Sequence, residues 1–317
     1  MSEGAGASDA TAPGRMPAPA WAEVLRRTWQ RIWADRLPQL CAAVAFFAVL
    51  SVAPVLVTAL SVYGTVNDPE QALEQLSAVA GMLPDQLEPI VADQLVTITT
   101  ASTQVLTWRG LAALVIALWT ATMAAVDLID ALTVAYHERE TRGLLHRAAL
   151  ALAFVLGGAL LLGGVIALAG AASDGLAGTS DAVRTTAQVL VWPALAVLMA
   201  AVLAVLYRFA PDRRRARWRW ISWGAATATV LWVLSSAGLF AYVQSLGTYE
   251  ATYGSLAGVA ISMFWLWLTV FLVVAGGVLN AESERQTARD STVGPERPLG
   301  QRGAVVADSV PPYPDGA

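Results

Sequence analysis

The chain has 317 residues, of which 56% are hydrophobic and 14% charged, and its formal net charge is −4. Soluble globular domains are about 45–50% apolar and roughly 25% charged. A water-soluble globule of this composition would expose more apolar surface than a soluble monomer tolerates. The composition therefore excludes an ordinary soluble enzyme and predicts an integral membrane protein.

The residues before the first long apolar run divide into two parts. Residues 1–18 are rich in Ala, Gly and Pro, which predicts a disordered N-terminal tail. Residues 19–37 predict an amphipathic helix with Trp on its apolar face and Arg on its polar face, which suits the cytoplasmic membrane interface. Packing of this helix on the protein's own cytoplasmic surface is the alternative. Pro38 predicts a break before the first span. The apolar face comprises Trp21, Val24, Leu25, Thr28, Ile32 and Trp33, and the polar face Arg26, Arg27, Gln30 and Arg31.

Six apolar runs follow, each long enough to cross a bilayer core of about 30 Å. Because every backbone polar group must be satisfied within lipid, these runs predict six transmembrane helices in an all-α membrane domain over residues 38–285. Small residues at four-residue spacing in the third run, Gly163 among them, predict close helix packing. The predicted spans cover about 39–63, 110–135, 148–172, 187–209, 219–243 and 255–280.

The arginines set the predicted orientation. All twenty basic residues are arginine, and with the N-terminus inside, eighteen of them fall on the cytoplasmic side. Only Arg109 and Arg184 fall outside, so the positive-inside bias predicts an N-in, C-in topology. The outer loop of residues 64–109 is too long to lack structure, and we expect short helices there. Residues 286–317, rich in Pro, Gly and Asp, predict a disordered cytoplasmic tail.

The predicted spans contain two acidic residues, Asp127 and Asp130, which share one face of the second helix. A carboxylate at the bilayer centre costs at least about 2.5 kcal/mol, so such acids usually face a cavity, a partner or an ion path. One interpretation is a proton- or cation-responsive pair within a polar cavity. The alternative places both acids near the cytoplasmic headgroups, paired with Arg142 or Arg147.

The fourth and fifth spans are joined by an inner loop rich in Arg and Trp. One interpretation of this loop is a topology anchor. The other is a site for anionic lipid headgroups, because the attraction of each Arg to an anionic leaflet contributes about 1 kcal/mol of binding free energy. The loop offers only a small surface for binding RNA, so we expect no nucleic-acid partner. No motif indicates a catalytic residue, a metal site or a cofactor, and His137 lacks the second His of a zinc helix. The headgroup candidates are Arg213, Arg214, Arg215, Arg217 and Arg219.

Several segments resemble the YihY/BrkB family of bacterial inner-membrane proteins, whose members were once mislabelled ribonuclease BN. Two positions depart from the family pattern: Thr133 and Glu250 stand where relatives usually carry Asn, which leaves a hydrogen-bonding role of those amides in doubt here. The matching segments are Asp35-Arg36 with Ala42–Phe47 and Ser51–Pro54, then Ala131–Gly143, then Tyr207–Pro211, and finally Tyr249–Leu256 and Trp265–Trp267 through Leu279–Glu282.

The resemblance implies a plasma-membrane location and a link with envelope lipid or lipopolysaccharide export, and it supplies no catalytic residue. We expect a transporter or lipid-translocating protein in envelope maintenance, with a non-transporting scaffold for envelope assembly as the alternative. Ribonuclease activity is not expected, since phosphodiester cleavage usually needs clustered acids and metal ions. Expected partners are membrane lipids, with a second copy or envelope-assembly proteins left open. The motif candidates for a functional centre, with helix packing as their alternative role, are Pro54, Tyr136, Arg142, Tyr253, Gly254, Asn280 and Glu282.

Overall fold

The computed structural model describes residues 9–66, 103–176, 180–245 and 255–311. Within these ranges the chain forms helices and no strand, and six of the helices are long and apolar enough to cross a membrane. This confirms the predicted all-α class and the six spans. The six helices are α2 (Leu37–Val66), α5 (Thr103–Ala135), α6 (Leu144–Leu176), α7 (Asp181–Phe209), α8 (Trp218–Ser245) and α10 (Ser255–Arg285).

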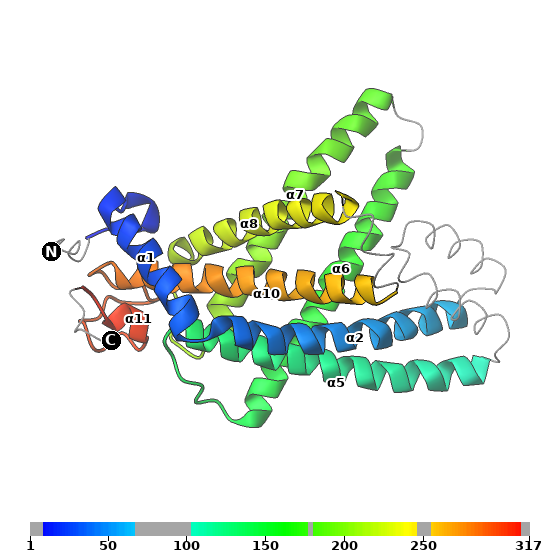
Figure 1. The fold of residues 1–317 in the computed structure, drawn as a ribbon, viewed down its shortest axis with the longest axis horizontal. Coiled ribbons are helices and arrows are strands. Elements are labelled where there is room, and N and C mark those ends of the chain that lie inside the picture. The colour runs from blue at the N-terminus through cyan, green and yellow to red at the C-terminus, as the bar shows by residue number, and fades with distance from the viewer. Residues whose placement is uncertain (1–8, 67–102, 177–179, 246–254, 312–317) are drawn as a thin grey trace.

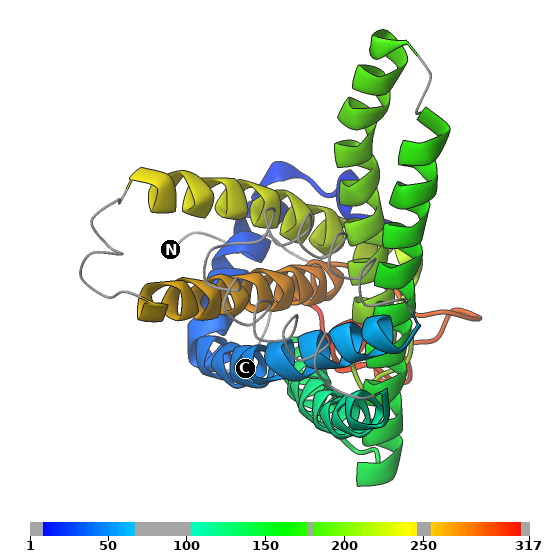
Figure 2. The same cartoon turned by 90° about the vertical axis from the view of Figure 1, so that its right-hand side faces the viewer.

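The six long helices fall into two groups. Helices α2, α5, α8 and α10 run side by side, whereas α6 and α7 cross them at a steep angle and project beyond them (Figures 1 and 2). Helix α6 packs on α5, and α7 packs on α8. The described ends of the chain lie together at one end of the bundle (Figure 1). We call it the inner end, because the arginine distribution predicts that it is cytoplasmic.

Helix α1 (Ala18–Ala34) lies at the inner end and packs against α10 and α2. The chain turns between α1 and α2 at Arg36, whose φ is 51°. Pro38 lies in the first turn of α2, where the missing N–H of proline costs no helical hydrogen bond. The break therefore lies just before the proline that predicted it.

One face of α1 is buried in the protein, which is the alternative that the sequence left open. Val24 and Ile32 are buried on this face. A second apolar stripe stays exposed: Leu25, Trp29 and Trp33 are each more than half exposed. The Trp29 and Trp33 rings lie edge to face, with their centroids 5.6 Å apart. The stripe is of the kind that a membrane interface accepts, because tryptophan combines an apolar ring with a polar N–H.

Both terminal segments are folded where the structure describes them, so the prediction of disorder from residue 286 is wrong for residues 286–311. Helix α11 (Val305–Asp308) buries Val306 and Ala307 against the inner end. The buried Arg302 holds this segment by donating hydrogen bonds to the backbone carbonyls of Ala288 and Ala307, both at 2.7 Å. Composition reports low hydrophobicity in such a segment but not the side-chain hydrogen bonds that order its backbone.

The N-terminal tail follows the same pattern between residues 9 and 18. It forms a short 3-10 helix, η1 (Pro13–Arg15), and buries Met16. Trp21 donates its indole N–H to the carbonyl of Pro13 at 3.2 Å. The predicted disorder is therefore wrong for residues 9–18. Residues 1–8 and the outer-loop residues 67–102, where short helices were expected, lie outside the described residues.

We expect Arg302→Gln to release the segment 286–311 from the inner end. Hydrogen bonds to a charged group contribute about 1.5–3 kcal/mol each, so local opening should become about tenfold more frequent or more. Limited proteolysis should then cleave this segment about tenfold faster than in the wild type. Arg297→Gln, which changes an exposed arginine of the same segment, should leave the rate within about twofold. Equal cleavage of both variants would contradict the role of Arg302.

Candidate functional site

The two acidic residues of the second span occupy different environments. Asp130 accepts hydrogen bonds from the guanidinium of Arg147 on α6 at 3.0 and 3.1 Å. Asp127 is half-buried and forms no hydrogen bond or ion pair with the part of the chain that the structure describes. At 1.5 Å per residue, Asp127 lies about 12 Å from the inner end of α5, one turn deeper than Asp130. Only Asp130 has the arginine partner that the alternative interpretation proposed.

A fully buried carboxylate, that of Glu282, is the centre of an ion-pair cluster at the end of α10. Its Oε2 accepts a hydrogen bond from Nε of Arg27 at 2.8 Å. Its Oε1 lies 2.8 Å from Nε2 of His137 and 3.2 Å from Nη1 of Arg285. The cluster therefore ties α1, the loop after α5 and α10 together.

A second buried ion pair ties the loop between α7 and α8 to α10. The guanidinium of Arg213 donates to the fully buried Glu284 at 2.8 Å, and the hydroxyl of Ser291 donates to the same carboxylate at 2.9 Å. The Arg213 guanidinium also lies 5.1 Å from the centroid of the buried Tyr136 ring. Burial raises the pKa of the Tyr136 phenol, so this side chain stays neutral. With 2% of its side chain exposed, Arg213 has no surface left for a lipid headgroup.

Asn280 joins α10 to the first turns of α8. Its Oδ1 accepts a hydrogen bond from the backbone N–H of Gly224 at 2.7 Å, and its Nδ2 donates to the carbonyl of Ile221 at 3.0 Å. The helices approach closely here: a Cβ added to Gly224 would overlap the carbonyl oxygen of Gly276 and the Asn280 amide. Asn280 thus holds a helix contact, which is the packing role left open for the motif residues.

The remaining motif residues lie in several places. Arg142 binds Glu140 at 2.6 and 2.7 Å and donates to the carbonyl of Ala210 at 2.8 Å, so it joins the two inner loops. Its hydrogen bond lowers the pKa of the Glu140 carboxyl. Pro54 lies in the middle of α2, away from the inner-end clusters. Tyr253 and Gly254 lie outside the described residues.

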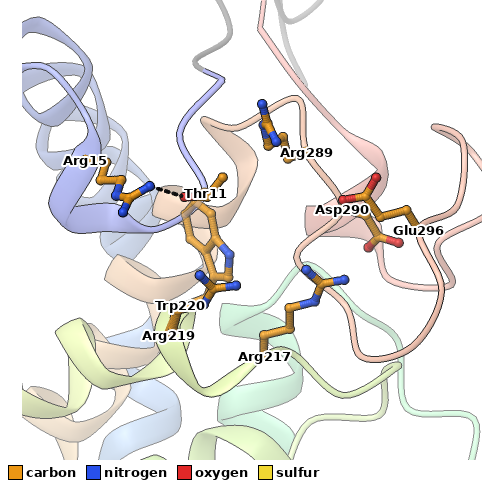
Figure 3. Close-up of a pocket in the computed structure, with 8 residues that line it drawn as sticks. All are labelled: Thr11, Arg15, Arg217, Arg219, Trp220, Arg289, Asp290 and Glu296. Atoms are coloured by element: carbon orange, nitrogen blue, oxygen red, sulfur yellow. Dashed lines mark hydrogen bonds between the residues drawn. The ribbon is translucent and has the colours of Figure 1, made fainter.

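The other headgroup candidates separate by environment. Arg214 donates to the carbonyl of Val293 at 2.7 Å, and the guanidinium of Arg215 lies 4.7 Å from the centroid of the Phe209 ring. Arg217 and Arg219, in contrast, line a pocket of about 260 Å³ at the inner end. Figure 3 shows the eight residues that line it, which are Thr11, Arg15, Arg217, Arg219, Trp220, Arg289, Asp290 and Glu296.

Sequence reasoning missed most of the charged partners at the inner end. Arg27 was placed on the polar face of its helix, although it lies three residues from Val24 and packs on the same side. Glu284 and Arg285 fall beyond the predicted end of the last span. The signal was present in the run from Asn280 to Arg285, where mostly polar residues continue the helix of the last span. Their partners lie up to 255 residues away in sequence, so no local pattern reveals them.

These features define a multi-pass membrane protein whose inner end is held together by buried ion pairs. The chain belongs to the virulence factor BrkB family, whose family model matches residues 28–299. This confirms the resemblance on which the sequence analysis relied. No solved structure matches the chain.

Three relatives illustrate the similarity. A ribonuclease-like protein of Bacillus subtilis is 28% identical over 174 residues, which are 53% of this chain and 63% of the relative. UPF0761 membrane proteins of Paraburkholderia xenovorans and Rhodospirillum centenum are each 26% identical, over 79% and 94% of this chain and 57% and 65% of the relatives. The chain thus spans less than two thirds of the length of each. With its six apolar helices, it is a multi-pass protein of the bacterial inner membrane.

Proposed function

We propose that this protein is a transporter that moves lipid across the inner membrane in maintenance of the cell envelope. The observation that carries the proposal is Asp127, a half-buried carboxylate within a membrane span that forms no hydrogen bond or ion pair with a described residue. Placing an acidic side chain within a span costs free energy, and such a residue usually marks an ion path or a substrate path. The pair of Asp130 and Arg147, one turn closer to the inner end, supplies both charges that a zwitterionic or anionic headgroup would contact on entry.

A non-transporting scaffold for envelope assembly is the second candidate. The observation that favours it is the rigid inner end, where the buried pairs of Glu282 and Glu284 join four segments of the chain. A scaffold needs such a fixed surface and no path through the membrane. We propose that the protein is not an enzyme under either of these two candidate functions. Clustered acids that hold metal ions are usual for phosphodiester cleavage, and no group of three or more metal-binding side chains lies among the described residues.

The test is lipid movement by the full chain reconstituted in liposomes that carry a fluorescent phospholipid, with and without a pH gradient. We expect the wild type to move the phospholipid and Asp127→Asn to move it at least about tenfold more slowly, as for a step that loses about 1.4 kcal/mol of barrier stabilisation. Asp127→Glu, which keeps the carboxylate, should restore a measurable part of the rate. Only a titrating carboxylate predicts a rate that follows the pH gradient in wild type and not in Asp127→Asn.

Asp35→Asn is the matched control, because Asp35 forms a partly exposed ion pair with Arg31 outside the spans. It should leave the rate unchanged. No movement by the wild type under any condition would overturn lipid transport and leave the scaffold, whose partners crosslinking in intact membranes would then identify. Equal rates in wild type and Asp127→Asn would remove Asp127 from the path.

A further inference from the structure

The pocket of Figure 3 gathers four arginines from three segments of the chain. Arg15 comes from η1, Arg217 and Arg219 flank the start of α8, and Arg289 follows α10. None of the four forms an ion pair with a described residue. Arg15 donates to Thr11 at 3.3 Å and Arg217 to the carbonyl of Thr292 at 2.9 Å, which are neutral acceptors. None of the four positive charges is therefore neutralised by a direct ion pair.

Seven other arginines, on α1, α6, α10 and the inner loops, form ion pairs with Asp or Glu at 2.6 to 3.2 Å. The remaining nine form no ion pair with a described residue either, so the absence of an ion pair does not by itself distinguish the pocket. What distinguishes the pocket is that four such arginines line one hollow. Like charges at close range repel, so bringing four guanidinium groups to one hollow costs free energy that a bound anion would offset.

The two acids in the pocket do not neutralise it. Asp290 is buried, and its carboxylate accepts hydrogen bonds from the N–H and hydroxyl of Thr292, both at 2.8 Å, and from the N–H of Arg297 at 3.0 Å. Burial alone would raise the pKa of Asp290, but these hydrogen bonds lower it, and the carboxylate stays occupied by its own loop. Glu296 is exposed and leaves two net positive charges in the hollow.

The surroundings indicate which anion fits. The pocket lies at the start of α8, where the helix dipole adds positive potential. Trp218 and Trp223 of the same helix are about half exposed, as is typical of the membrane interface. A wider hollow of about 500 Å³ shares Thr11, Arg15 and Arg289 with the pocket, so a group attached to the anion has room. Guanidinium groups match phosphate oxygens with two parallel hydrogen bonds.

We propose that this pocket binds a phosphate group, carried either by a phospholipid headgroup or by a soluble phosphorylated compound. This proposal is independent of the lipid-transport proposal. Lipid transport rests on Asp127, and Asp127 is not one of the residues that line the pocket. Its natural test is binding by the purified full chain in detergent. One arm titrates it with glycerol 3-phosphate, and the other with mixed micelles containing phosphatidylglycerol, against micelles of the same phosphate-free detergent without lipid.

We expect binding in at least one arm, and the arm identifies the source of the phosphate. Arg217→Gln/Arg219→Gln should weaken it about 100-fold, as the loss of two charged hydrogen bonds predicts. The matched control is Arg26→Gln/Arg139→Gln, which removes the same charge from exposed positions at the inner end and should change affinity less than about twofold. Glu296→Gln should strengthen binding roughly two- to fivefold, an effect that misfolding cannot produce.

Three results would overturn the proposal. The first is absence of binding to the wild type in both arms. The second is an equal loss of affinity in the control pair, which would indicate only a general charge effect. The third is failure of Glu296→Gln to strengthen binding, because removal of a negative charge from a phosphate pocket must favour the anion.

Discussion

Replacing Glu282 with alanine is expected to destabilise the protein by about 3–5 kcal/mol, the usual cost of breaking a buried ion pair. The reason is that Arg27 and Arg285 would keep their charges at positions where each is less than one-tenth exposed. At about 2 °C per kcal/mol for a chain of this size, the apparent Tm in detergent should fall by roughly 6–10 °C. Thermal unfolding followed by circular dichroism would measure the fall.

Glu23→Ala is the control for this prediction. Glu23 pairs with Arg26, whose side chain is 58% exposed, and contacts Arg27 of the cluster only at 3.4 Å, so its loss leaves Arg27 paired with Glu282. Exposed pairs contribute at most about 1 kcal/mol. A second variant gives a change of the opposite sign: adding Arg27→Leu to Glu282→Ala should recover part of the lost stability, because it removes one of the two buried charges that have lost the Glu282 carboxylate. If Glu282→Ala lowered the Tm no more than Glu23→Ala does, the cluster would not hold the inner end together.

The membrane domain could be predicted from sequence because its rule is local. A span needs about twenty apolar residues and nothing else, so each of the six runs identifies its own helix without knowledge of the others. No local rule of this kind predicts the ion pairs of the inner end. Arg27 and Glu282 are separated by 255 residues and become partners only when α1 packs on α10. Each looks like an ordinary surface charge when its own segment is considered alone.

The C-terminal segment is a second case in which a local sequence pattern did not predict the structure. Composition predicted disorder in residues 286–317, because the segment lacks an apolar face of its own. The described part is ordered by polar groups instead: Asp308 accepts hydrogen bonds from the N–H groups of Gly300 and Gly303, at 2.7 and 3.1 Å. Beyond the short apolar contact of Val306 and Ala307, the segment is ordered by hydrogen bonds to its own backbone, and these leave no hydrophobic pattern in the sequence.

Helix packing was predicted at the wrong glycines. The small-residue spacing of the third span favoured close contact at Gly163, but among the described residues no atom outside its own stretch of helix lies within 4 Å of a Cβ added there. The close contact lies instead between Gly224 of α8 and Gly276 of α10. The difference is physical: a strip of small residues permits close approach, whereas the contact that forms is the one that a directional bond selects. Here that bond is the hydrogen bond from Gly224 to Asn280.

Gly224→Leu is therefore expected to disrupt the contact of α8 with α10. The added side chain would displace the carbonyl of Gly276 and break the hydrogen bond to Asn280, so the loss should reach at least about 3 kcal/mol, the upper range for overpacking. The contact of α8 with α10 holds together the parts of the inner end that these two helices carry. The variant should therefore lose most of its monodisperse fraction after extraction from membranes. Size-exclusion chromatography and the apparent Tm of the remaining folded protein would measure both effects.

Gly158→Leu on α6 is the matched control, because it makes the same substitution in another span where a Cβ would meet no described atom outside its own stretch of helix within 4 Å. Leucine favours helix over glycine by roughly 1 kcal/mol, so this variant should be as stable as the wild type or slightly more stable. The opposite signs of the two effects separate packing from membrane insertion, since both variants make a span more apolar. Equal behaviour of the two variants would mean that the α8–α10 contact does not limit stability. A functional role for the Asn280 amide would then become the stronger explanation for this buried polar side chain.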